Sequence, residues 1–114
     1  MTIEVEHLDQ PPVALVRVRG ELDFGTTPQL VEALDGVPRP GESVLFELSG
    51  LSFCDSSGLG AFIATHKAAA AGGGRTYVAG ATSTVLTAMR VTTLDRLFNL
   101  RDTVDEALAE LRAA

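Results

Sequence analysis

The sequence predicts an α/β protein with one mixed β-sheet of four to five strands and about four helices packed on it. Apolar strand patterns alternate with amphipathic helical patterns in the order ββαβαβαβα, which implies this arrangement. The chain has 114 residues and is 46% hydrophobic and 21% charged, as suits one domain, 1–114, with a sizeable core. No repeat, linker or low-complexity tail interrupts it.

The first two strands are predicted to form an antiparallel hairpin. Residues 2–8 alternate between apolar and polar side chains, as a half-buried strand does. Pro11-Pro12 marks the turn, and Val13 to Val18 form the second strand, which runs into Gly20.

The first helix follows this hairpin directly. Thr26 or Thr27 is expected to cap it, and Pro28 stands at an early helical position, where its missing N–H costs least. Gly36 ends the helix.

The middle of the chain contains the central strand and the longest helix. Residues 44–48 are nearly continuously apolar, which predicts a strand covered on both faces. The apolar run continues through Leu51 and Phe53 to a helix over 56–71, which Gly72-Gly73-Gly74 terminates. The expected buried face of this helix consists of Leu59, Phe62, Ile63 and His66.

The last third of the chain repeats the strand-and-helix alternation. Residues 76–79 and 97–100 are predicted strands, and each precedes a predicted helix, over 82–90 and 102–113.

Charge and cysteine content exclude several classes of function. The formal net charge is −6, with 15 acidic against 9 basic residues, which argues against nucleic acid or an anionic membrane as the partner. Cys54 is the only cysteine, so neither an internal disulfide nor a cysteine-based zinc site is expected. Cys54 is expected to be a small buried apolar residue. No signal peptide or membrane span is visible, so a cytoplasmic location is expected.

The most informative segment runs from Asp55 to Gly60, where a strand pattern gives way to a helical one. Ser56 therefore lies at a helix N-terminus, where the dipole favours a phosphate. Its simplest role is that of the N-cap, with Asp55 as a rival, and capping does not exclude phosphorylation. Gly58 and Gly60 indicate either a flat contact surface or relief of local crowding.

The same segment does not match a nucleotide-binding loop. Gly58-Leu59-Gly60 resembles the start of a dinucleotide fingerprint, but Ile63 occupies the place of its third glycine. No Gly-Lys-Ser/Thr triplet is present for a phosphate loop. No cofactor is therefore expected, and nucleotide binding is kept only as an unlikely alternative.

A catalytic role for Ser56 also finds little support. The hydrolase pattern Gly-x-Ser-x-Gly is absent. His66 lies ten residues further along the same helix, about 15 Å in axial rise, too far to accept the proton of Ser56. His66 is expected to be a partly buried packing residue and His7 a solvent-facing residue at a strand end. No catalytic or metal-binding residue is predicted.

Five segments together identify a family resemblance. They are Gly20-Glu21-Leu22-Asp23, Leu51-Ser52-Phe53, Asp55-Ser56-Ser57-Gly58-Leu59-Gly60, Gly72-Gly73 and Leu94-Asp95-Arg96-Leu97-Phe98. The chain resembles bacterial anti-sigma factor antagonists, the single-domain members of the STAS family, over nearly its whole length. It departs from the commoner pattern at Cys54 and at Thr93, where a glycine often stands.

The resemblance implies a binding module controlled by phosphorylation. The dephosphorylated form would bind an anti-sigma factor that is also a serine kinase, which frees the sigma factor. The kinase would then modify Ser56, and a serine phosphatase would restore the binding form. The expected switch surface consists of Asp23, Thr26, Asp55, Ser57, Gly58 and Gly60 around Ser56, with Ser57 as a possible second acceptor. The alternative is a STAS module of another signalling or transport assembly.

Overall fold

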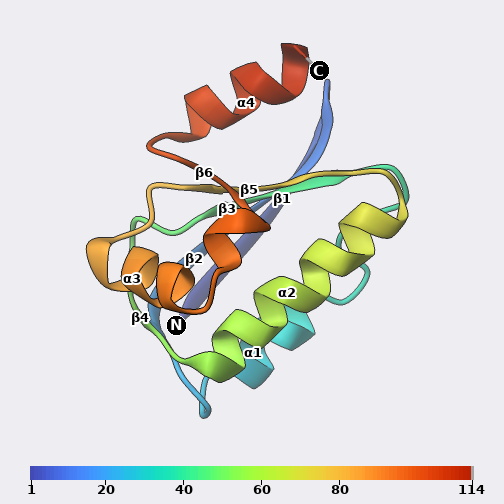
Figure 1. Ribbon diagram of the computed structural model, residues 1–114. Helices are drawn as coiled ribbons and strands as arrows, with labels where there is room; N and C mark the ends of the chain where they lie inside the picture. The colour runs from blue at the N-terminus through green and yellow to red at the C-terminus, as the bar shows by residue number, and fades with distance from the viewer. Residues whose placement is uncertain (114) are drawn as a thin grey trace.

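The computed structural model, which describes residues 1–113, contains a six-stranded mixed sheet with helices on both faces (Figure 1). The strands are β1 (Thr2–Asp9), β2 (Pro12–Leu22), β3 (Ser43–Glu47), β4 (Leu51–Cys54), β5 (Thr76–Ala79) and β6 (Asn99–Arg101). The helices are α1 (Thr27–Ala33), α2 (Ser56–Ala71), α3 (Ser83–Val91), α4 (Val104–Ala113) and the short 3₁₀ helix η1 (Leu94–Arg96). The predicted fold class is confirmed, with a strand more than the upper estimate.

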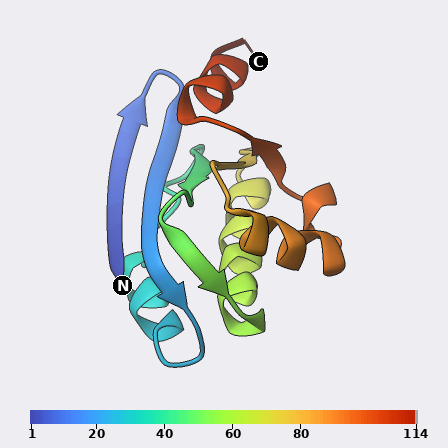
Figure 2. The ribbon, with the colours of Figure 1, turned by 90° about the vertical axis from the view of Figure 1, so that its left-hand side faces the viewer.

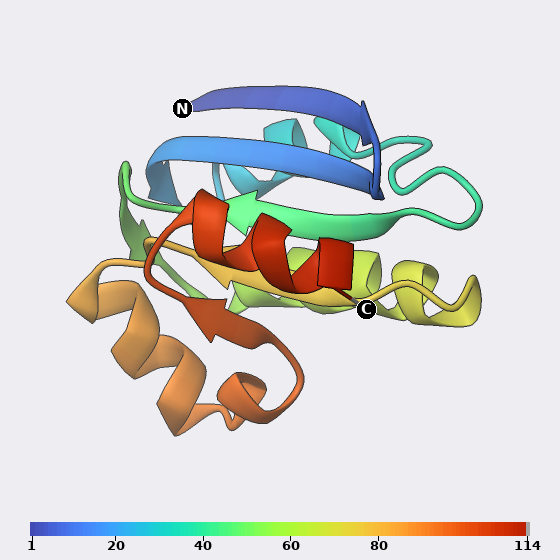
Figure 3. The same cartoon turned by 90° about the horizontal axis from the view of Figure 1, so that it is seen from above.

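The sheet has the strand order β1-β2-β3-β5-β6, and β4 pairs with β2 outside this path. β1 and β2 are antiparallel, while β2, β3, β5 and β6 run parallel (Figure 3). The long strand β2 pairs with β3 along its first half and with β4 along residues 20–22. A register shift lies between Gly20 and Glu21, and the pairing of Leu22 with Cys54 brings the ends of β2 and β4 together.

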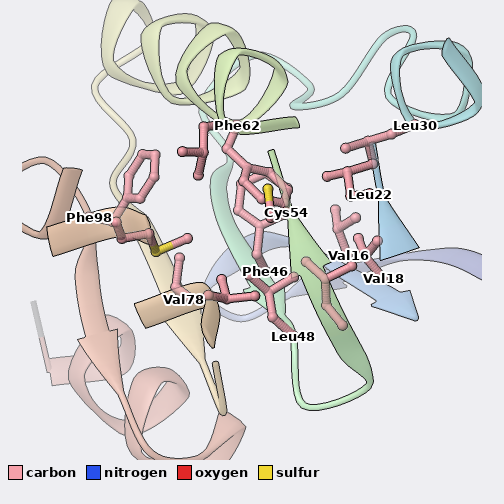
Figure 4. Packing of buried hydrophobic residues seen from close by; sticks show 14 of the residues in the cluster. Val16, Val18, Leu22, Leu30, Phe46, Leu48, Cys54, Phe62, Val78 and Phe98 are labelled. Carbon is pink, nitrogen blue, oxygen red and sulfur yellow. The ribbon is translucent and has the colours of Figure 1, made fainter. Parts of the chain in front are cut away.

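The core lies on both faces of the sheet, as the apolar run of the central strand predicts. Successive residues of β3 point to opposite faces, so Val44 and Phe46 pack in the larger cluster and Leu45 in the smaller one. Figure 4 shows the larger cluster, in which the rings of Phe46 and Phe62 lie 4.7 Å apart between β3 and α2. α4 covers the other face (Figure 3).

Most predicted elements are confirmed, and two differ for tertiary reasons. The helix over 56–71 and the strand over 76–79 have the predicted bounds. The sequence predicts only an apolar run at the position of β4. This run becomes a strand because it pairs with the end of β2, which extends beyond Gly20. The last strand begins at Asn99 rather than Leu97, because Leu97 is the C-cap of η1 and the buried Phe98 lies in the turn that follows it.

The two histidines differ in how well the sequence predicts them. His7 is half-buried rather than solvent-facing: its Nδ1 atom lies 2.7 Å from Oε2 of the buried Glu42, which belongs to the segment before β3. His66 is a packing residue as predicted. Its Nδ1 atom lies 2.9 Å from Oγ1 of Thr76, and its ring packs edge-on against Phe98.

No helix within residues 1–113 is both long and apolar enough to cross a lipid bilayer.

Candidate functional site

Asp55 caps the N-terminus of α2. Its backbone is extended, and its Oδ1 atom accepts hydrogen bonds from the N–H of Ser57 at 2.9 Å and of Gly58 at 3.3 Å. Ser56 is therefore the first residue of the helix and not the cap. The cap assignment to Ser56 is wrong and the rival assignment to Asp55 is correct, because the carboxylate already satisfies these two N–H groups.

The two serines that follow this cap have different surroundings. Ser56 is exposed. The Ser57 hydroxyl is half-buried, donates a hydrogen bond of 2.6 Å to Asp55 Oδ1 and lies 3.0 Å from Thr27 Oγ1. Ser56 is therefore open to solvent, whereas the Ser57 hydroxyl would have to leave both partners before it could react.

The loop after β2 is held by its own side chains. Oδ1 of Asp23 accepts hydrogen bonds from the N–H groups of Gly25 (2.9 Å) and Thr26 (3.0 Å). The Thr26 hydroxyl accepts from the Asp23 N–H at 2.9 Å and donates to the Glu21 carbonyl at 2.8 Å. Asp23 thus forms the turn that follows β2. Thr26 precedes α1 but makes no side-chain cap, because its hydroxyl points back into the loop.

Hydrogen bonds join this loop to the start of α2. The Asp55 N–H donates to the Leu22 carbonyl at 3.0 Å, and the Thr27 hydroxyl meets that of Ser57. Figure 2 shows the loop after β2 and the start of α2 side by side at the lower end of the molecule. The structure thus brings the predicted residues Asp23 and Thr26 next to Asp55, although they lie far apart in the sequence.

The site carries negative charge only. The Ser57 hydroxyl holds the pKa of Asp55 below its ordinary value of 3.8, against an opposing contribution from partial burial. The backbone N–H groups of Gly58, Ser57 and Phe24 lower this pKa further. No lysine or arginine occurs in 20–38 or in 50–66. Asp55 is half-buried, so it adds negative electrostatic potential to this surface but little exposed surface area.

Replacing the cap tests this arrangement. We expect Asp55→Ala to lower the melting temperature at neutral pH, because two helix N–H groups lose their acceptor, while Asp55→Asn keeps an acceptor and loses only the charge. A lowered carboxyl pKa stabilises the fold above the ordinary pKa, and this contribution disappears as the pH falls through the lowered value.

The melting temperatures of wild type and Asp55→Asn should therefore differ by a constant amount between pH 7 and pH 5 and converge in acid, near and below the ordinary carboxyl value of 3.8. A difference that persisted unchanged to the acid limit would contradict a charged cap at residue 55.

The two glycines of α2 have separate explanations. A Cβ atom on the buried Gly58 would lie 2.5 Å from Cδ2 of Leu22 and 2.9 Å from Sγ of Cys54. Gly58 thus relieves crowding beneath the helix. It is buried and is not part of an exposed contact surface, which corrects its expected place in the switch surface. A Cβ atom on the exposed Gly60 would have nothing within 4 Å, so Gly60 leaves the helix surface flat.

Cys54 packs beneath the same turn, as expected of a small apolar side chain. It is 6% exposed, and burial, followed by the nearby charge of Asp55, raises the pKa of its thiol to about 12. The thiol is therefore neutral at physiological pH, which makes it a poor nucleophile.

Sequence reasoning missed two residues of the site. Thr27 was expected only as a helix cap, yet its buried hydroxyl connects the loop to Ser57, a tertiary contact without a local signal. Phe24 could have been noticed in the sequence, because a large aromatic residue in a polar turn is unusual. It is 84% exposed in the structure.

Within residues 1–113, the site has no histidine that is positioned to activate the Ser56 hydroxyl. Hydrogen bonds engage both histidines elsewhere, His7 with Glu42 and His66 with Thr76, so neither is positioned by its partners to activate Ser56. Fold and site together define a small α/β protein whose longest helix displays an exposed serine beside a hydrogen-bonded acidic loop.

The chain belongs to the STAS domain family, whose family model matches residues 2–107. It is 30% identical over 103 residues to an anti-sigma-B factor antagonist of Staphylococcus aureus, covering 90% of this chain and 95% of that protein. A crystal structure of an anti-sigma factor antagonist from Mycobacterium paratuberculosis superposes with a TM-score of 0.84 at 31% identity, over 97% of this chain and 93% of that one. The phosphorylated form of the Bacillus cell fate determinant SpoIIAA shares the fold, with a TM-score of 0.75 at 22% identity over 97% and 100% of the two chains.

Proposed function

We propose that this protein is an anti-sigma factor antagonist whose binding is switched off by phosphorylation of Ser56. The unmodified form binds an anti-sigma factor that is also a serine kinase, and the sigma factor is released. The kinase phosphorylates Ser56 and a serine phosphatase reverses this. The observation that carries the proposal is the exposed Ser56 hydroxyl at the capped end of α2, beside the engaged hydroxyl of Ser57. The names of the relatives support the same class of function.

The charge of a phosphate supplies the change in affinity. Phosphorylation adds about −1.5 to −2 charges at neutral pH. A serine that is phosphorylated by its partner faces a carboxylate of that partner, since protein kinases use one to accept the hydroxyl proton. At about 5 Å and an effective dielectric constant near 20, each added charge costs roughly 3 kcal/mol. The affinity would fall on the order of a hundredfold or more.

The fold is expected to tolerate the same phosphate. Ser56 is exposed, so the phosphate displaces no packed side chain. The dipole of α2 favours an anion at its N-terminus by about 0.3–1 kcal/mol. This gain is reduced because Asp55 already accepts from Ser57 and Gly58 and repels the added charge. Stability should therefore change little while association changes greatly.

The proposed activity is binding rather than catalysis, and the proposed partners are proteins. The acidic balance of the chain, −6, disfavours nucleic acid and anionic membranes. A protein that regulates the availability of a sigma factor acts where transcription takes place, so we propose a cytoplasmic location.

Phosphate transfer in a purified mixture tests the proposal. The protein is incubated with candidate anti-sigma kinases and ATP, and the modified residue is mapped by mass spectrometry. We expect a single phosphate on Ser56, none on Ser56→Ala, and continued modification of Ser57→Ala. Transfer of the phosphate to Ser57 in the wild type would overturn the assignment of the acceptor. If the protein bound none of the candidate kinases stably, the proposed function would be contradicted.

A further inference from the structure

Phe24 is the most exposed large apolar side chain of the described residues. It is 84% exposed, compared with 44% for Phe53 and 56% for Val31. We propose that Phe24 is an apolar anchor that inserts into a pocket of the anti-sigma factor, a pocket with a basic rim. This inference depends on the proposed function and names the contact that positions the partner over Ser56.

The loop holds the backbone on both sides of Phe24 in place. The residues on both sides are tied together, since Asp23 Oδ1 accepts from the N–H groups of Gly25 and Thr26. The Thr26 hydroxyl bonds to the backbone of Asp23 and of Glu21, which closes the turn from the other side. A rigid aromatic residue loses little conformational entropy when it is buried by a partner. The loop therefore does not need to fold on binding.

Phe24 lies next to the proposed phosphorylation site. The Asp55 N–H donates to the Leu22 carbonyl at 3.0 Å, so Phe24, two residues after Leu22, lies near Ser56, which directly follows Asp55. The pairing of Leu22 with Cys54 holds the two segments together from below. A partner that reaches the Ser56 hydroxyl therefore passes over the loop that carries Phe24.

The surrounding charge indicates which kind of partner covers Phe24. Glu21 is exposed on one side of Phe24, Asp23 is half-buried next to it, and no lysine or arginine occurs in 20–38. An anionic membrane would be repelled by these acids. A second copy of the chain would place acids against acids across a two-fold axis. A different protein with basic groups around an apolar pocket complements both the ring and its charged border.

The basic rim and the phosphate switch act at different points of this contact. The rim faces Glu21 and Asp23, while the Ser56 hydroxyl faces the partner's phosphate-transfer site and its carboxylate. The acidic loop speeds association, and the phosphate opposes it only at the position where the chemistry takes place.

The test measures affinity for the kinase that phosphorylates Ser56, using Phe24→Ala and two controls. Aromatic anchors in protein interfaces lose roughly thirtyfold or more in affinity when truncated. We expect a loss of this size for Phe24→Ala, partial recovery for Phe24→Leu, and weakening of wild-type binding as salt is raised. Val91→Ala is the matched control, because Val91 is 78% exposed at the end of α3. The affinity of Val91→Ala should equal that of wild type, and none of the three variants should change the melting temperature.

Each outcome has a separate meaning. If Phe24→Ala binds as tightly as wild type while Ser56→Asp does not bind, the proposed role of Phe24 as an anchor is wrong and the proposed function stands. If Ser56→Asp also binds like wild type, the proposed function fails. If Phe24→Ala instead abolishes a wild-type dimer in sedimentation, or binding to vesicles containing phosphatidylserine, the occupant is a second copy or a membrane and the inference is overturned.

Discussion

Ser56→Asp is expected to weaken binding of the anti-sigma factor by on the order of a hundredfold, while Ser56→Ala retains the wild-type affinity. The aspartate places about one negative charge near the position of the proposed partner carboxylate, which costs roughly 3 kcal/mol at short range. The alanine removes only an exposed hydroxyl, because Asp55 and not Ser56 caps α2. Titration calorimetry with the purified partner measures both affinities.

Ser83→Asp is the matched control for this experiment. Ser83 is the exposed first residue of α3, which follows its own cap, Thr82, so the substitution adds the same charge at the same helical position elsewhere. Its affinity should equal that of wild type. Equal weakening by Ser83→Asp and Ser56→Asp would reduce the effect to overall charge, and no weakening by Ser56→Asp would contradict the switch.

Gly58→Ala and Gly60→Ala are expected to change stability in opposite directions. Both replacements favour the helix by up to about 1 kcal/mol. At residue 58 the new methyl group would lie 2.5 Å from Leu22, a fully buried side chain. Overpacking of this kind costs about 1–3 kcal/mol, which offsets the helical gain, so the net effect should be a loss of up to about 2 kcal/mol. At residue 60 the space is open, and the helical gain remains.

Urea unfolding of the two variants gives both free energies under one set of conditions. A stabilised Gly58→Ala would show that Leu22 and Cys54 move aside without cost, which would contradict the close packing beneath the first turn of α2. The affinity of Gly60→Ala is a separate measurement, because its methyl group would stand on the surface that is proposed to contact the partner.

The sequence predicts best those elements whose signals are local. The bounds of α2 follow from the Asp55-Ser56 corner and from Gly72-Gly73-Gly74, both within the segment itself. β4 was not predicted as a strand, because its identity depends on the extension of β2, about thirty residues earlier in the chain. A pairing partner at such a distance leaves no periodic pattern in residues 51–54.

The same division applies to the candidate site. The run Asp55-Ser56 locates the site in the sequence, but the choice of cap between the two residues needed the extended backbone of Asp55. The difference between Ser56 and Ser57 depends on the local bond of Ser57 to Asp55 and also on Thr27, which reaches Ser57 only through the packing of α1 beside α2. Crowding at Gly58 depends on the position of Leu22 and has no local signal.

The affinity of one preparation for the anti-sigma factor, measured before and after complete phosphorylation of Ser56, tests the central claim most directly. We predict a decrease of at least about a hundredfold, without a change in the backbone amide spectrum outside the first turn of α2 and the loop at Asp23. Equal affinity of the two forms would contradict the account.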